Sequence, residues 1–83
     1  NPFKTTTRIA YVVRGTGEHV HIGVYDVAGR RMKVLADGYQ SPGRYELSWD
    51  GSSDAGARAN NGVYFVRSVV AGKVQTMRVI YVK

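Results

Sequence analysis

The sequence predicts an all-β protein, an antiparallel two-sheet sandwich of six to seven short strands. Apolar and polar residues alternate with a period of two along most of the chain, glycine-containing turn signals separate the alternating segments, and no segment shows the period of an amphipathic helix. With 83 residues the chain is expected to form one domain, residues 1–83, around a single core.

The first two strands are expected on either side of a short glycine turn. Residues 5–13 alternate between apolar and polar side chains, residues 15–17 break the pattern with Gly-Thr-Gly, and the alternation resumes over residues 20–24. Such a short connection between two strands is typical of a hairpin. We therefore predict that these strands pair with each other.

A second turn and a third strand follow. Asp26 can accept hydrogen bonds from the backbone that follows it, and Gly29 tolerates a positive φ, so the segment between them is expected to form a tight turn. The next strand is expected over residues 31–36, with Met32 and Val34 on one side.

The fourth strand carries the only tryptophan. A connection containing Gly38, Pro42 and Gly43 is expected over residues 37–43, and Tyr45, Leu47 and Trp49 then share one face of a strand. Residues 50–62 contain three glycines, several short polar side chains and no large apolar residue, which predicts a surface loop.

Three structural motifs are expected around this loop. Trp49 should bury its ring between the sheets, and Asp50 with Gly51 should turn the chain immediately afterwards. Tyr64 should bury its ring and find a hydrogen-bond partner for its hydroxyl. Gly62 begins the closing hairpin, which is expected over residues 62–70 and 74–82. Both of its strands are apolar on both faces, as is typical of central strands.

The charge balance favours contact with polyanions. Twelve Lys and Arg against six Asp and Glu give a net charge of +6. The candidate polyanion or partner contacts are Arg30, Arg31, Lys33, Arg8, Arg14, Arg67, Arg78 and Lys83. Only residues 30–33 cluster in the sequence, so a solvated basic surface is the alternative. Most aromatic rings alternate with apolar neighbours, which favours core packing, and Tyr25 and Tyr39 are the first candidates for rings that stack with a base beside these cations.

No catalytic or metal-binding pattern is evident, so we predict that the chain is not an enzyme and takes no cofactor. It lacks cysteine, and no serine lies in a glycine-flanked nucleophile turn. A calcium loop counted from Asp50 would need Gly at the sixth position and an acid at the twelfth, where Ala55 and Asn61 stand. His19 and His21 fall on one face of a strand without a third ligand, which favours surface histidines over a metal site.

Several motifs together carry a family resemblance. They are Asn1-Pro2-Phe3, the run Val24 to Arg30, Trp49-Asp50-Gly51, Asp54-Ala55-Gly56, Gly62 to Arg67 and Val79 to Lys83. In this order and over nearly the whole chain, the sequence resembles the immunoglobulin-like domain of the flagellar hook-capping protein and the similar C-terminal sorting domains of bacterial type IX secretion substrates. The resemblance implies an immunoglobulin-like sandwich, with residues 79–83 as a natural C-terminus.

The resemblance also implies a function. The chain is expected to be a non-catalytic, extracellular or cell-surface C-terminal module for secretion sorting or surface anchoring of a larger secreted protein, with the secretion machinery or neighbouring domains as partners. Two alternatives stay open. The chain could be a structural subunit that self-assembles through edge strands, or it could coat a polyanion such as extracellular DNA or lipopolysaccharide through its basic surface.

Overall fold

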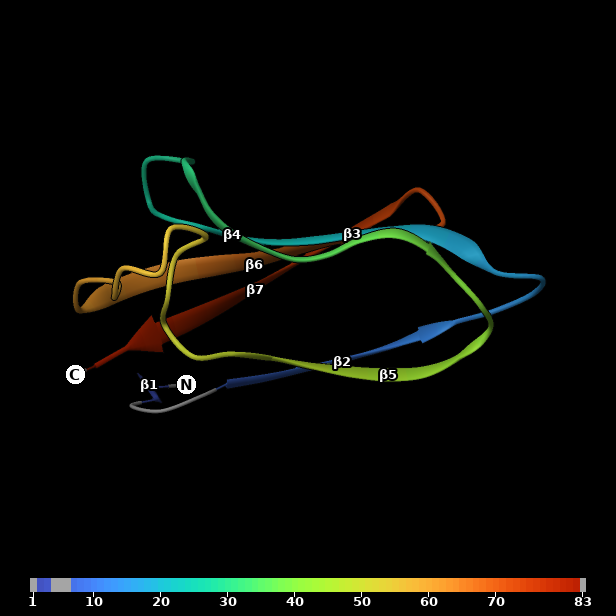
Figure 1. Cartoon of the computed structure of the whole chain (residues 1–83), viewed down its shortest axis with the longest axis horizontal. Coiled ribbons are helices and arrows are strands. Elements are labelled where there is room, and N and C mark those ends of the chain that lie inside the picture. Colours follow the sequence, from blue (N-terminus) through green and yellow to red (C-terminus); the bar gives the residue numbers. More distant parts are fainter. Residues whose placement is uncertain (1, 4–6, 83) are drawn as a thin grey trace.

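The computed structural model describes residues 2–3 and 7–82, and within them every regular element is a strand. The strands are β1 (Pro2–Phe3), β2 (Thr7–Val13), β3 (Glu18–Tyr25), β4 (Arg31–Gln40), β5 (Gly43–Trp49), β6 (Gly62–Val70) and β7 (Lys73–Tyr81). Figure 1 shows two layers, with β2 and β5 facing β3, β4, β6 and β7. The predicted all-β sandwich is confirmed.

The two sheets are unequal in size. The larger sheet has the order β1-β7-β6-β3-β4, and the smaller sheet consists of β2 and β5. β1 runs parallel to β7, and the other neighbouring strands are antiparallel. In the smaller sheet, Thr7 lies opposite Trp49 and Val13 lies opposite Gly43.

The predicted hairpin between the first two long strands is wrong. The Gly17 N–H donates to the Arg14 carbonyl at 3.3 Å, so the turn is tight, but it carries the chain from β2 in one sheet to β3 in the other. Val13 and Val20, on either side of the turn, are both buried in the common core. Alternation identifies the buried face of each strand, whereas pairing depends on the edges, which the pattern does not specify.

β4 is longer than predicted. It continues to Gln40, so Asp37 and Gly38 lie inside the strand, opposite His21 and Val20 of β3, and only Ser41 and Pro42 connect it to β5. Gly38 has a φ of 144°, which a glycine adopts without steric cost, so a turn-forming residue is tolerated within the strand.

Two irregularities change which β4 side chains reach the core. The register passes from Ile22 opposite Ala36 to Gly23 opposite Val34, which leaves Leu35 as an extra residue. A second shift leaves Met32 unmatched between Lys33 and Arg31. Met32, Leu35 and Ala36 pack against the core, so the prediction that Val34 accompanies Met32 is wrong.

The closing hairpin is confirmed, but only one of its strands is central. β6 lies between β3 and β7, whereas β7 gains a second neighbour only where Ile80 and Tyr81 pair with β1. From Lys73 to Arg78, β7 is exposed. The expectation that both strands are covered on both faces is therefore wrong for most of β7.

One apolar cluster joins the two sheets. Its buried members are Ile9, Val13, Val20, Ile22, Val24, Trp49, Ala59, Tyr64, Val66, Val79 and Tyr81. Trp49, at the end of β5, is completely buried and contacts the rings of Tyr64 and Tyr81 from the larger sheet. Gly51 follows with a φ of 85°, and a Cβ there would lie 2.7 Å from the Tyr81 ring.

Asp26 organises the turn between β3 and β4. Its Oδ1 accepts hydrogen bonds from the backbone N–H groups of Ala28 and Arg30, both at 2.9 Å, while Oδ2 lies 3.0 Å from the Arg30 Nε. Gly29, with a φ of 83°, donates its N–H to the Asp26 carbonyl. The backbone hydrogen bond from Arg30 is the main reason that the pKa of Asp26 lies below its ordinary value of 3.8.

We expect Gly51→Ala to destabilise the fold more than Gly56→Ala. Both glycines have a similar positive φ, 85° and 87°, but a Cβ at Gly56 meets nothing within 4 Å. Left-handed backbone costs an alanine about 1–2 kcal/mol at either site, and the clash with Tyr81 should add about 1–3 kcal/mol at Gly51 alone. Urea denaturation followed by circular dichroism measures the difference, and equal losses would contradict the close packing of Gly51 on Tyr81.

We expect Asp26→Asn to reduce the dependence of stability on pH. Because the pKa of Asp26 is lowered on folding, its contribution is fully present above its ordinary value of 3.8 and is lost as the pH falls below that value. The stability difference between wild type and Asp26→Asn should therefore shrink on acidification, as measured by urea denaturation at a series of pH values.

The matched control is Arg30→Gln, which removes the guanidinium but keeps the backbone N–H. Since that N–H is the largest cause of the lowered pKa, this variant should retain most of the acid sensitivity. If Arg30→Gln lost the acid sensitivity as fully as Asp26→Asn, the side-chain ion pair would be the main cause of the lowered pKa of Asp26, which would contradict this assignment.

Candidate functional site

One end of the sandwich is closed by aromatic rings. The Trp49 ring lies 5.2 Å from Tyr64 in an edge-to-face arrangement and 6.1 Å from Tyr81, measured between centroids. The Trp49 Nε1–H donates to the Ser52 carbonyl at 2.8 Å, and the Arg58 guanidinium lies 5.9 Å from the Tyr81 centroid. This end is therefore held together by packed rings and by hydrogen bonds within the domain.

Tyr64 ties the loop between β5 and β6 to the sandwich. Its hydroxyl donates to the Asn60 carbonyl at 2.7 Å, four residues earlier in the chain. Burial is the main cause that raises the pKa of Tyr64, and the negative charge of Asp26 adds to the effect. Gly62, which begins β6 with a φ of 153°, lies between the loop and the strand.

The acidic side chains of this loop stabilise its first turn and join the loop to β4. Asp50 Oδ1 accepts hydrogen bonds from the Ser52 hydroxyl and N–H, and the hydroxyl is the main cause that lowers the pKa of Asp50. The Asp54 N–H donates to the Met32 carbonyl at 2.9 Å, and its Oδ1 accepts from the Val34 N–H at 3.2 Å. The loop is thereby joined to the outer edge of β4.

The two histidines lie on the outer face of β3, opposite the buried Val20 and Ile22. His19 Nε2 is 3.4 Å from Asp37 Oδ1, and the two side chains are 70% and 58% exposed. His21 lies opposite Asp37 in the ladder and is half-buried. Over residues 2–3 and 7–82, no group of three metal-ligating side chains occurs.

The structure distributes the predicted basic contacts over several surfaces. Arg30 is paired with Asp26, Lys33 Nζ donates to the Ser52 hydroxyl at 3.3 Å, and Arg31 is exposed beside them. The other four predicted contacts that the structure describes are exposed on β2 or the turn after it (Arg8, Arg14) and on the outer face of the larger sheet (Arg67, Arg78). Lys83 lies outside the described residues. Of the three basic side chains at residues 30–33, Arg30 and Lys33 therefore interact with other side chains of the domain, and Arg31 is exposed.

The two tyrosines singled out for stacking differ in environment. Tyr39 is 67% exposed and its hydroxyl donates to the Thr16 carbonyl, which holds the ring over the turn after β2. Tyr25 is half-buried, with its ring against Gly23 on the outer face of the larger sheet. The structure does not bring them together.

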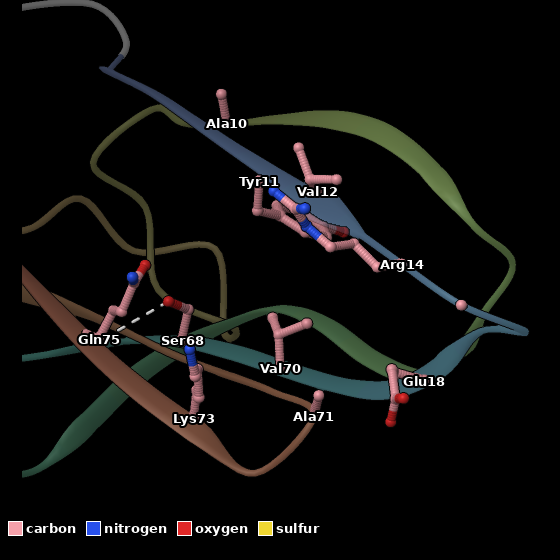
Figure 2. A pocket seen from close by; sticks show the side chains of 11 residues that line it. Ala10, Tyr11, Val12, Arg14, Glu18, Ser68, Val70, Ala71, Lys73 and Gln75 are labelled. Atoms are coloured by element: carbon pink, nitrogen blue, oxygen red, sulfur yellow. Dashed lines mark hydrogen bonds between the residues drawn. The ribbon is translucent and has the colours of Figure 1, made fainter.

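Sequence reasoning missed an open groove along one side of the sandwich. A hollow of about 500 Å³ separates β2 from the ends of β6 and β7, and a second hollow of about 390 Å³ continues it along β2. Both hollows are lined by Ala10, Tyr11, Ser68 and Gln75. Figure 2 shows Tyr11 and Arg14 on the β2 side, with Ser68, Val70 and Gln75 across from them.

A sequence signal for this groove exists in the closing hairpin. Ser68 and Gln75 lie opposite each other, on the same side of β6 and β7 as the buried Val66 and Val79. A closed core would require apolar residues at these positions. The polar pair therefore marks where the smaller sheet no longer covers the larger one.

The part of the chain that the structure describes contains no helix with the length and apolar character to cross a membrane.

Comparison with solved structures supports the fold. The chain is similar to dimeric latent PorU from Porphyromonas gingivalis, at 24% identity and a TM-score of 0.73, over 99% of this chain and 8% of that chain. It is also similar to FLGD from P. aeruginosa, at 23% identity and a TM-score of 0.59, over 88% of this chain and 57% of that chain. The chain thus spans only part of both proteins.

The family follows from the sequence comparison. No curated protein sequence matches the chain. The family described as the FlgD Ig-like domain matches residues 3–73, which is most of the chain and includes every strand from β2 to β6. The chain therefore belongs to the FlgD Ig-like domain family.

Proposed function

We propose that this chain is a non-catalytic domain that directs a larger secreted protein across the outer membrane or anchors it at the cell surface. The observation that carries the proposal is the match over nearly the whole domain to PorU, of which the chain spans 8%, together with membership of the FlgD Ig-like family. A small domain that forms a minor part of a large protein fits an accessory role better than a complete enzyme.

The geometry of the polar groups supports a non-catalytic role. Asp26, Asp50 and Asp54 accept hydrogen bonds from the turns and edges on which they lie. A catalytic acid or base needs a free site beside it for a substrate, with a second group in reach. These carboxylates instead stabilise connections, as expected in a domain whose surface is its functional part.

The domain should be sufficient to export a reporter protein. We would fuse residues 1–83 to the C-terminus of a periplasmic reporter and express it in a bacterium with type IX secretion. The fusion should reach the medium or the cell surface, as measured by fractionation and protease accessibility of intact cells, whereas the reporter alone should stay in the periplasm.

A matched pair of variants tests whether export depends on the folded sandwich. Gly56→Ala fusions should be exported, and Gly51→Ala fusions should be exported less because their sandwich is destabilised. A folded wild-type fusion that accumulates in the periplasm would contradict the sorting role and favour the alternatives, self-assembly or polyanion coating.

A further inference from the structure

We propose that the free edge of β2 and the groove beside it bind an extended acidic segment of a partner protein, which joins the smaller sheet as a third strand. The proposal rests on the open side of the sandwich and does not depend on the sorting role.

The edge of β2 is available for pairing. Within residues 2–3 and 7–82, β2 pairs only with β5, so alternate N–H and C=O groups along its other edge point away from its partner. Unpaired strand edges are the sites at which proteins bind extended peptides by strand addition. β2 is Thr7–Val13, which sets the pairing length of the incoming segment at about seven residues.

The opposite margin of the larger sheet is protected. Asp54 contacts the Met32 carbonyl and the Val34 N–H, so the loop occupies part of the β4 edge. Leu35 and Met32 interrupt the regular register of the same strand. Bulges and covering loops are features that prevent further strand addition. No such cover is present along β2 in the described residues.

The groove supplies a floor for an added strand. Gln75 and Met77 lie on the core side of β7 but are exposed, and they line the hollows beside β2. Met77 is 40% exposed, and Val70 lines the same groove. A strand beside β2 would cover these side chains, with small apolar residues of its own pointing inward.

The charge of the groove selects an acidic occupant. Three basic residues, Arg8, Arg14 and Lys73, and one acid, Glu18, line the two hollows. An extended segment with carboxylates on its outward side and at its ends would complement this surface.

The same charges disfavour a second copy of this chain. The stretch from Thr7 to Arg14 contains two arginines and no acid, and each chain carries a net charge of +6. Pairing β2 with β2 would bring positively charged edges together, which costs free energy at low ionic strength.

The test uses the isotopically labelled 83-residue chain and a synthetic peptide of about eight residues that alternates valine with glutamate and is blocked at both ends. Amide hydrogen exchange measured by NMR should slow about tenfold or more at β2 in the presence of saturating peptide, with little change at β4. A peptide of the same length and charge, with proline in place of each valine, should not protect β2, because proline cannot donate to the ladder.

A matched pair of charge reversals tests the groove. Arg14→Glu with Lys73→Glu should weaken peptide binding about tenfold or more, because both cations line the groove. Arg67→Glu with Arg78→Glu changes the net charge equally on the outer face of the larger sheet and should leave the affinity within about twofold. Equal weakening in both pairs would overturn the proposal in favour of non-specific attraction.

Three further outcomes would also overturn it. Slower exchange of β7 amides with unchanged exchange of β2 amides would show that the peptide pairs with β7 and not with β2. Equal protection of β2 by oligothymidylate would make the groove a nucleic-acid site. Concentration-dependent dimerisation with protection of β2 in the absence of peptide would assign the edge to a second copy.

Discussion

The packing of one indole ring between two unequal sheets is the constraint on which the rest of the structure depends. Trp49 ends β5 in the two-stranded sheet, and its ring is completely buried against Tyr64 of β6 and Tyr81 of β7. The ring therefore joins the small sheet to the large one at the end where the polar loop begins. Removing so large a buried side chain typically costs about 3–5 kcal/mol, a large share of the stability of a small domain.

The surrounding residues follow from this burial. Gly51 lies so close to the Tyr81 ring that a side chain would not fit, and the Ser52 carbonyl accepts the indole N–H. From there the loop returns along β4 through Asp54 and is fastened to β6 by the Tyr64 hydroxyl. The closed end is thus held by ring contacts and internal hydrogen bonds, whereas at the open side the described residues leave one edge of β2 unpaired and the side chains of Gln75 and Met77 exposed. The proposed peptide site lies at the open side, because a strand edge there can still form hydrogen bonds.

The fold class and the placement of most strands could be predicted from the sequence, because alternation identifies strands and their buried faces. The pairing of strands could not. The turn at residues 15–17 looks like a hairpin locally, and only the packing of Val13 and Val20 in one core shows that it joins two sheets. β4 differs from its prediction for a related reason, because Leu35 and Met32 interrupt the alternation while Gly38 continues the strand. The groove depends on which strands of the larger sheet the smaller sheet covers, although Ser68 and Gln75 carry a sequence signal for it.

The fluorescence of Trp49, the only tryptophan of the chain, tests the central claim most directly. Acrylamide quenching of the folded chain should be nearly absent, with blue-shifted emission, because the ring is completely buried. During urea denaturation, quenching should rise together with the loss of β-sheet circular dichroism in one transition. Strong quenching or solvent-like emission in the folded chain would show that the indole is not enclosed between the sheets and would contradict this account.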